Sequence, residues 1–205
     1  MKTKHCLLIL ALALGLGLGA IGANVAVGGD DAPANPMGLP PEVLARLKTG
    51  PEHKEMAWYL GDWDVSIAMK MPGMEMPPTK GTCTYSWLID GRWMMSRMSA
   101  PMMGMPMEWV HIHGYNTMTK TFETIGFDSM SNDAKVSRGN KVTQDGSTYG
   151  FQGMMNEWMN GQIYKPFRTV IRKLDPNTFE LEVWDPEIGA NGMEVMRFTY
   201  TRRAK

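Results

Sequence analysis

Four dipeptides that favour tight turns constrain this chain more than any other feature: Asp90-Gly91, Asp145-Gly146, Asn160-Gly161 and Asn191-Gly192. Each stands between runs rich in β-branched, aromatic and methionine residues. A two-residue hairpin turn of type I′ needs positive φ at both central positions, which Asn or Asp followed by Gly adopts with little strain. The sequence therefore predicts β-hairpins at these four points.

Alternation of apolar and polar residues predicts the strands between the turns. In the first run one face carries Trp63, Val65, Ile67, Met69 and Met71, and the other carries Asp62, Asp64, Ser66 and Lys70. Such alternation is typical of a strand with one buried face. With about ten such runs and no βαβ spacing, we predict an all-β protein, a single antiparallel meander closed into a lipocalin-like barrel.

A short helix is expected before the first strand, from about Glu52 to Leu60. Pro51 suits its first turn, and Gly61 suits its end. The apolar residues expected to cover the mouth of the barrel are Met56, Ala57 and Leu60.

The N-terminal residues indicate export. Lys2 and Lys4 precede an uncharged run over 7–20 that ends in small residues, which is typical of a secretory signal peptide. We predict a signal peptide over 1–26, a flexible linker over 27–50 and the barrel domain over 51–205, in the periplasm or secreted, with no membrane span after cleavage. An uncleaved anchor is the competing interpretation, but glycines interrupt the run.

Charge and cysteine content argue against a nucleic-acid-binding protein and against a disulfide-stabilised one. The chain carries 21 Lys and Arg against 21 Asp and Glu, and loss of Lys2 and Lys4 would leave 19 against 21. This balance disfavours a nucleic-acid partner. Cys83 would be the one cysteine left after cleavage, so no internal disulfide is expected. Its alternation with Tyr85 and Trp87 predicts a buried, unreactive thiol.

Methionine is unusually abundant, with 21 residues. Thioethers are soft ligands for Cu(I), and His111 and His113 share one face of an expected strand, so a copper site is one hypothesis. Its candidate ligands are Met102, Met103, Met105, Met107, His111 and His113. The alternative is that methionine fills the core or lines an adaptable apolar surface. No hydrolase elbow or phosphate loop is present, so the sequence favours a non-enzymatic protein.

Five segments, in order, carry a resemblance to a known family: GPEHKEMAWYLGDWDV, LIDGRWMM, GYNTMTK, GFDSMS and FTYTRRAK. Together they resemble the family called domain of unknown function 1579, over about residues 50–203. The resemblance implies a lipocalin-like or calycin-like barrel, often secreted, with no established activity or catalytic residues. The chain departs from the family in its methionine density and in Tyr164-Lys165-Pro166-Phe167, where a glycine-centred turn is expected.

These observations predict a non-catalytic barrel that binds a small apolar molecule in its lumen, without a cofactor. The expected lining consists of Trp63, Ile67, Met69, Tyr85, Trp87, Met107, Trp109, His111 and His113. Two alternatives remain open, a methionine-rich copper(I)-binding protein and a barrel with a filled core that acts through its outer surface.

Overall fold

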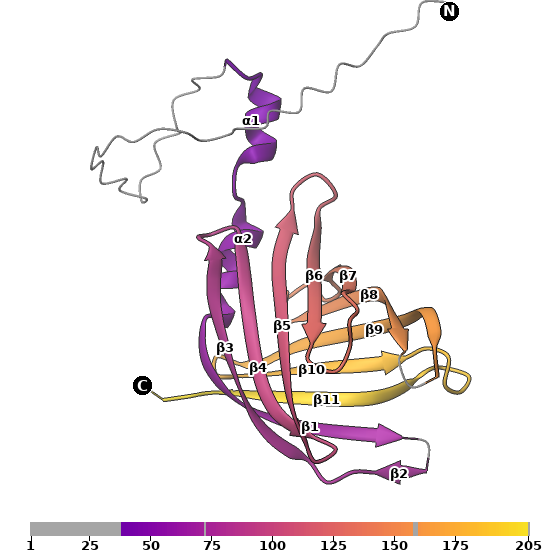
Figure 1. Ribbon diagram of the computed structural model, residues 1–205. Helices are drawn as coiled ribbons and strands as arrows, with labels where there is room; N and C mark the ends of the chain where they lie inside the picture. The colour runs from indigo at the N-terminus through magenta and orange to yellow at the C-terminus, as the bar shows by residue number, and fades with distance from the viewer. Residues whose placement is uncertain (1–37, 72, 158–159, 205) are drawn as a thin grey trace, which may run out of the picture. The chain divides into compact units, whose positions relative to one another are not determined.

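The protein folds into a closed antiparallel β-barrel (Figure 1). The structure, a computed structural model, describes residues 38–71, 73–157 and 160–204. The helical elements are α1 (Pro41–Leu47), α2 (Pro51–Met56) and the 3₁₀ helix η1 (Ala57–Tyr59). The strands are β1 (Gly61–Met71), β2 (Met74–Glu75), β3 (Thr79–Ile89), β4 (Trp93–Met102), β5 (Met105–Asn116), β6 (Thr121–Asp128), β7 (Lys135–Lys141), β8 (Thr148–Glu157), β9 (Gln162–Asp175), β10 (Thr178–Asp185) and β11 (Met193–Arg202).

Each strand of the barrel pairs with its neighbours in the sequence, and β11 pairs with β1 to close the ring. The two-residue β2 is appended to β1 outside the ring, so ten strands form the wall. The closing register pairs Trp63 with Arg202, and Ile67 with Phe198. The predicted fold class, an antiparallel meander closed into a barrel of about ten strands, is confirmed. None of the helices in the described part of the chain is long and apolar enough to cross a membrane.

The four predicted turn dipeptides all lie between consecutive strands, but their geometry differs from type I′. Each glycine has positive φ, for example 63° at Gly91 and 78° at Gly192. Among the described residues other than glycine, only Met103, Lys120 and Tyr164 have positive φ, so the preceding Asp or Asn does not. The connections that contain these four dipeptides are all longer than two residues. A type I′ turn needs positive φ at two positions, whereas a longer loop can turn with the left-handed conformation at the glycine alone.

The helix before β1 is shorter than expected. It ends as an α-helix at Met56 and continues as η1, and the chain turns into β1 at Gly61, where φ is 112°. The predicted apolar face is wrong at Ala57, which is exposed, whereas His53 and Met56 are buried. The change from 3.6 to 3.0 residues per turn rotates the inward face, so a continuous helical wheel misplaces it.

The helix α1 lies inside the segment predicted as a flexible linker. Its last residues are held by two side chains of the barrel domain, since Arg92 donates to the Leu47 carbonyl and Thr117 donates to the Arg46 carbonyl. The predicted signal peptide over 1–26 and the linker up to residue 37 lie outside the described residues, so both stay predictions.

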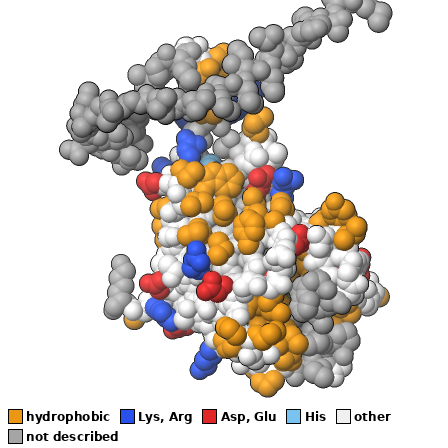
Figure 2. Space-filling view, in the orientation of Figure 1, with side chains coloured by type: hydrophobic (Ala, Val, Ile, Leu, Met, Phe, Trp, Pro, Cys, Tyr) orange, Lys and Arg blue, Asp and Glu red, His pale blue; other side chains and the backbone are white. Residues whose placement is uncertain are grey.

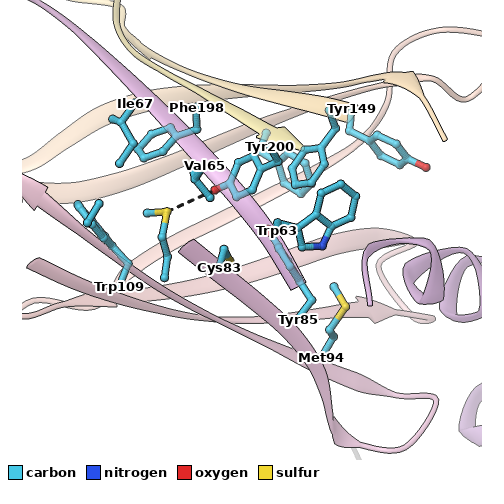
Figure 3. Close-up of a cluster of buried hydrophobic side chains, with 14 of the residues drawn as sticks. Trp63, Val65, Ile67, Cys83, Tyr85, Met94, Trp109, Tyr149, Phe198 and Tyr200 are labelled. Atoms are coloured by element: carbon cyan, nitrogen blue, oxygen red, sulfur yellow. Dashed lines mark hydrogen bonds between the residues drawn. The ribbon is translucent and has the colours of Figure 1, made fainter. Parts of the chain in front are cut away.

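Large side chains fill the middle of the barrel (Figure 3). Trp63 and Phe179 are fully buried, and Phe179 stacks on Tyr200 with ring centres 4.1 Å apart and planes 6° apart. The Tyr200 hydroxyl donates to the sulfur of Met98 at 3.8 Å, the contact dashed in Figure 3. Burial of such aromatic rings is the main source of barrel stability, because each removes a large apolar area from water.

The outer face of the barrel also carries apolar residues. Met95, Ile112 and Ile125 lie in register on neighbouring strands and point outward. Figure 2 shows hydrophobic side chains at the surface of this wall, interspersed with charged ones. The wall therefore lacks the strictly polar exterior that alternation alone predicts.

Candidate functional site

A small cavity lies inside the barrel beneath α2 and η1. Its volume is about 50 Å³. Its apolar wall consists of Met56, Tyr85, Met94, Phe122, Phe151 and Ile171. His113 and Thr124 add polar groups on one side, and Glu55 lies at the mouth. An apolar cavity of roughly 150 Å³ admits benzene, so the resting cavity accommodates a guest of only a few heavy atoms.

His113 is the main polar group of this cavity. Its Nε2 lies 3.1 Å from the Ser96 hydroxyl, and its Nδ1 lies 3.2 Å from the Thr124 hydroxyl. Burial, assisted by the neighbouring His111, lowers the pKa of His113 to about 3. The imidazole is therefore neutral at physiological pH, with one nitrogen that donates and one that accepts a hydrogen bond.

His111 stacks on His113 and lies against a glycine of the next strand. The two ring centres are 5.9 Å apart, and a Cβ on Gly126 would lie 2.6 Å from Cδ2 of His111. Burial, assisted by Lys135 and opposed by Asp128, lowers the pKa of His111 to about 4. Both imidazoles are thus held neutral. Only glycine at position 126 leaves room for the ring of His111.

A polar network closes the mouth of the cavity. The Tyr149 hydroxyl donates to Oε1 of Glu55 at 2.5 Å, and Nζ of Lys141 lies 2.7 Å from Oε2. Although burial opposes the ionised form, the hydrogen bonds from Lys141 and Tyr149 lower the pKa of Glu55. Because Glu55 belongs to α2 and its partners belong to β7 and β8, these contacts join the helix to the barrel wall.

Lys173 extends this network into a group of aromatic rings. Its ammonium lies 4.8 Å from the ring centre of Trp58, 5.1 Å from Tyr59 and 5.2 Å from Tyr149. It also donates to the Tyr149 hydroxyl at 3.4 Å. Burial lowers the pKa of Lys173, while Glu55 opposes that shift. Cation–π attraction therefore adds to the contacts that hold η1 over the barrel.

The structure places the predicted lining residues on inward-facing positions, but it does not bring them all to one cavity. Five are buried, namely Trp63, Ile67, Tyr85, Met107 and Trp109, and four are partly buried, namely Met69, Trp87, His111 and His113. Of these nine, Tyr85 and His113 line the cavity. The other seven do not line it, and most of them belong to the core or pack against it. Whether any of them contacts a guest stays a prediction.

The candidate copper ligands fall into two groups. Met102 and Met107 are buried, whereas Met103 and Met105 are 48% and 46% exposed at the β4–β5 hairpin. His113 lies six residues along β5 from Met107, which is roughly 20 Å in an extended strand. Within the described part of the chain, no three His, Cys, Asp or Glu side chains form a potential metal site.

Several residues of the site were missed by sequence reasoning: Glu55, Ser96, Thr124, Tyr149 and Lys173. Ser96 and Thr124 occupy inward positions of β4 and β6, between apolar neighbours. A polar residue at an inward position is the signal that could have identified them, because buried hydroxyls need partners. Glu55 and Lys173 have no such signal, since their contact depends on how α2 docks on the barrel.

Comparison with known proteins agrees with this architecture. The family described as "Protein of unknown function (DUF1579)" matches residues 48–202. No functionally curated protein matches the sequence. Among solved structures, Rv2717c from M. tuberculosis has a TM-score of 0.58 at 10% identity, and the match covers 77% of this chain and 100% of that one. That likeness supports the barrel fold alone.

A designed protein, the redesigned beta barrel b11L5F_LGL, has a TM-score of 0.38 at 8% identity. The match covers 72% of this chain and 94% of the designed one. A likeness of this size carries no weight for fold or function.

Proposed function

The chain belongs to the DUF1579 family of proteins of unknown function, and from that premise we propose that it is an exported, non-enzymatic barrel that holds a small apolar molecule in its interior. The observation that supports this proposal is the cavity beneath α2, whose mainly apolar wall carries a neutral imidazole and the Thr124 hydroxyl on one side and Glu55 at the mouth. Ligand sites commonly combine an apolar wall with a few polar groups that orient the guest.

The size of the cavity restricts the guest. At about 50 Å³ it lies well below the roughly 300–1,000 Å³ of pockets for drug-sized ligands. Met56 and Met94 line it, and methionine side chains repack more readily than branched ones. The guest is therefore a molecule of a few heavy atoms, or a larger one that displaces these two side chains and lifts α2.

Xenon tests the resting cavity directly, because it is small, apolar and chemically inert. We expect ¹²⁹Xe NMR to report one interior site in the wild type and none in Met94→Phe, which fills the cavity. Ile67→Leu is the matched control, since Ile67 is buried but does not line the cavity. Absence of a xenon site in the folded wild type would support the filled-core alternative instead.

A hydrophobic dye tests larger guests. We expect an environment-sensitive dye to bind the folded protein at an interior site that is lost in Met94→Phe. Unchanged dye binding in that variant would place the dye elsewhere and would contradict the interior site for larger molecules.

Copper(I) binding is the second candidate. Its support is that His111 and His113 are adjacent and neutral, the protonation state that metal ligation requires. Replacement of Met102, Met103, Met105 and Met107 by leucine removes sulfur while keeping the apolar volume nearly constant. If the methionines bind copper, the wild type retains Cu(I) against a competing chelator and the leucine variant does not, whereas retention by the leucine variant would leave the histidine pair as the site. If the wild type retains none, this candidate fails.

A further inference from the structure

A hollow larger than the interior cavity lies on the outer wall of the barrel. It is a groove of about 640 Å³ across β7, β8 and β9, whose strands lie side by side in Figure 1. The interior cavity is about 50 Å³. The groove therefore has the volume typical of a small-molecule site, whereas the interior cavity does not.

One row of the groove is apolar. Val136 pairs with Met154, and Met154 pairs with Pro166, so the three side chains stand in register on the outer face of neighbouring strands. Val136 is 39% exposed and Met154 is 53% exposed. Exposed apolar side chains in adjacent positions, with a hollow above them, are typical of a surface that contacts an apolar molecule.

The next row of the groove carries hydrogen-bond donors. Arg138 pairs with Gln152, and Gln152 pairs with Arg168, two residues along each strand from the apolar row. Two residues of a strand span roughly 7 Å, and the two arginines are separated by two strand spacings, roughly 10 Å. An anionic group above Gln152 would therefore lie between two guanidinium groups.

These donors are not fully used within the described part of the chain. Arg138 donates through Nε to Glu123, and among the described residues its two terminal nitrogens make no further side-chain hydrogen bond. Arg168 lies over the ring of Trp184 at 4.9 Å, and no carboxylate of the described residues forms an ion pair with it. The one acidic residue of the groove, Asp133, already accepts two hydrogen bonds from Asn156. The groove therefore presents more available positive than negative charge.

Backbone strain at the rim is a second, independent observation. Tyr164 has a φ of 55°, which is unfavourable for a residue with a side chain, yet its ring is 75% exposed. Its backbone N–H donates to the Asn156 side chain. Because the ring is exposed, burial of this side chain in the core does not compensate the conformation. Strain of this kind concentrates at ligand sites, where it fixes the direction of a contacting side chain.

We propose that this groove binds a single-chain anionic amphiphile, a fatty carboxylate. Its hydrocarbon chain lies across the Val136, Met154 and Pro166 row, under the ring of Tyr164, and its carboxylate lies between Arg138 and Arg168. The donor row lies two residues along the strands from the apolar row. A molecule that lies along the strands can therefore place its head group at the donor row and its hydrocarbon tail on the apolar row. Guanidinium groups bind carboxylates with paired, charge-assisted hydrogen bonds.

Decanoate tests the proposal, with decanol as the neutral analogue of the same chain length. In calorimetric titration of the folded full-length chain below the micelle concentration, we expect decanoate to bind at least tenfold more tightly than decanol. Arg138→Gln together with Arg168→Gln removes that difference and leaves decanol binding unchanged. Met154→Asp weakens both ligands. Arg203→Gln is the matched control, because Arg203 is a half-exposed arginine outside the groove.

Tyr164→Gly separates binding from stability. Glycine accepts positive φ without strain, so the unfolding midpoint does not fall, whereas decanoate binding weakens severalfold because the ring is lost. Met94→Phe, which fills the interior cavity, leaves decanoate binding unchanged. Decanoate binding by Met94→Phe therefore distinguishes the groove from the proposed interior site.

Three results would overturn the proposal. The first is equal affinity for decanoate and decanol in the wild type. The second is decanoate binding that survives the double arginine variant. The third is binding to phosphatidylglycerol vesicles without binding to monomeric decanoate, which would assign the groove to a lipid surface.

Discussion

The guanidinium group of Arg202 lies on the ring of Trp63, 4.1 Å from its centre, where β11 pairs with β1. The same group donates to the carbonyls of Leu60 and Trp58, at 2.7 and 2.6 Å. The Trp63 indole N–H donates to the Tyr59 carbonyl at 2.8 Å. This pair therefore lies at the end of the β1–β11 seam that closes the barrel, and it ties η1 to that seam.

Arg202→Met should destabilise the protein by about 2–4 kcal/mol, because it removes two charge-assisted hydrogen bonds and a cation–π contact. Arg202→Lys should lose less, since it keeps the charge but not the planar fork that reaches both carbonyls. Urea unfolding measures both changes. A loss within about 0.5 kcal/mol for the methionine variant would mean that solvent replaces these contacts.

Gly126→Ala should cost about 1–3 kcal/mol, because the new methyl group meets the ring of His111 at 2.6 Å. In a protein that already carries His111→Ala, the change Gly126→Ala should cost much less, since the ring that causes the clash is gone. A double-mutant cycle by urea unfolding gives the coupling. Additive effects of the two changes would contradict the contact.

Stability should fall as the pH falls from about 6.5 to between about 4 and about 3. The folded-state pKa values of His111 and His113 are lowered to about 4 and about 3, so the unfolded chain binds protons first. The stabilisation is fully present above pH 6.5 and is lost through this window, with a slope of at most about 1.4 kcal/mol per pH unit for each histidine.

The variant His113→Gln isolates one histidine from that slope. His53, whose pKa burial also lowers, acts in the same direction and remains in the variant. Unfolding measured across pH 4–7 should show a shallower slope for the variant than for the wild type. Equal slopes would mean that His113 titrates normally in the folded protein.

Cys83 should resist thiol reagents in the native state. Its side chain is 3% exposed, and burial raises its pKa to about 12. The thiolate that reacts is therefore scarce and shielded. Labelling followed by peptide mass spectrometry should show modification of Cys83 only after denaturation. Rapid labelling of the native protein at this position would show that the barrel opens near β3.

Export is testable at the N-terminus. The basic residues and the apolar run before residue 21 predict that a mature chain begins between about residues 22 and 28. Intact-mass measurement of the protein from the extracytoplasmic fraction checks this. Recovery of a soluble chain that still carries Met1 would contradict cleavage.

Local patterns were sufficient for the class of fold. The alternation of Trp63, Val65 and Ile67 with polar residues, and the turn dipeptides such as Asn191-Gly192, act through neighbours in the sequence. These interactions are the same in any barrel, so they predict strands, connections and antiparallel order. They also predicted the burial of Cys83, which the structure confirms.

Cross-strand and helix-to-barrel contacts could not be predicted in this way. The two rows of the outer groove depend on register, because a shift of one residue would turn Arg138 and Arg168 inward. The contact of Glu55 with Tyr149 joins residues 94 positions apart.

The sequence by itself therefore determined that this chain forms an antiparallel barrel, since period and turn chemistry are local properties. Only the tertiary structure decided how much space the interior leaves, and which polar side chains meet at the mouth and on the outer wall. The physical reason is that cavity volume and side-chain convergence depend on strand register and on the docking of α2, and both are set by the packing of the whole barrel.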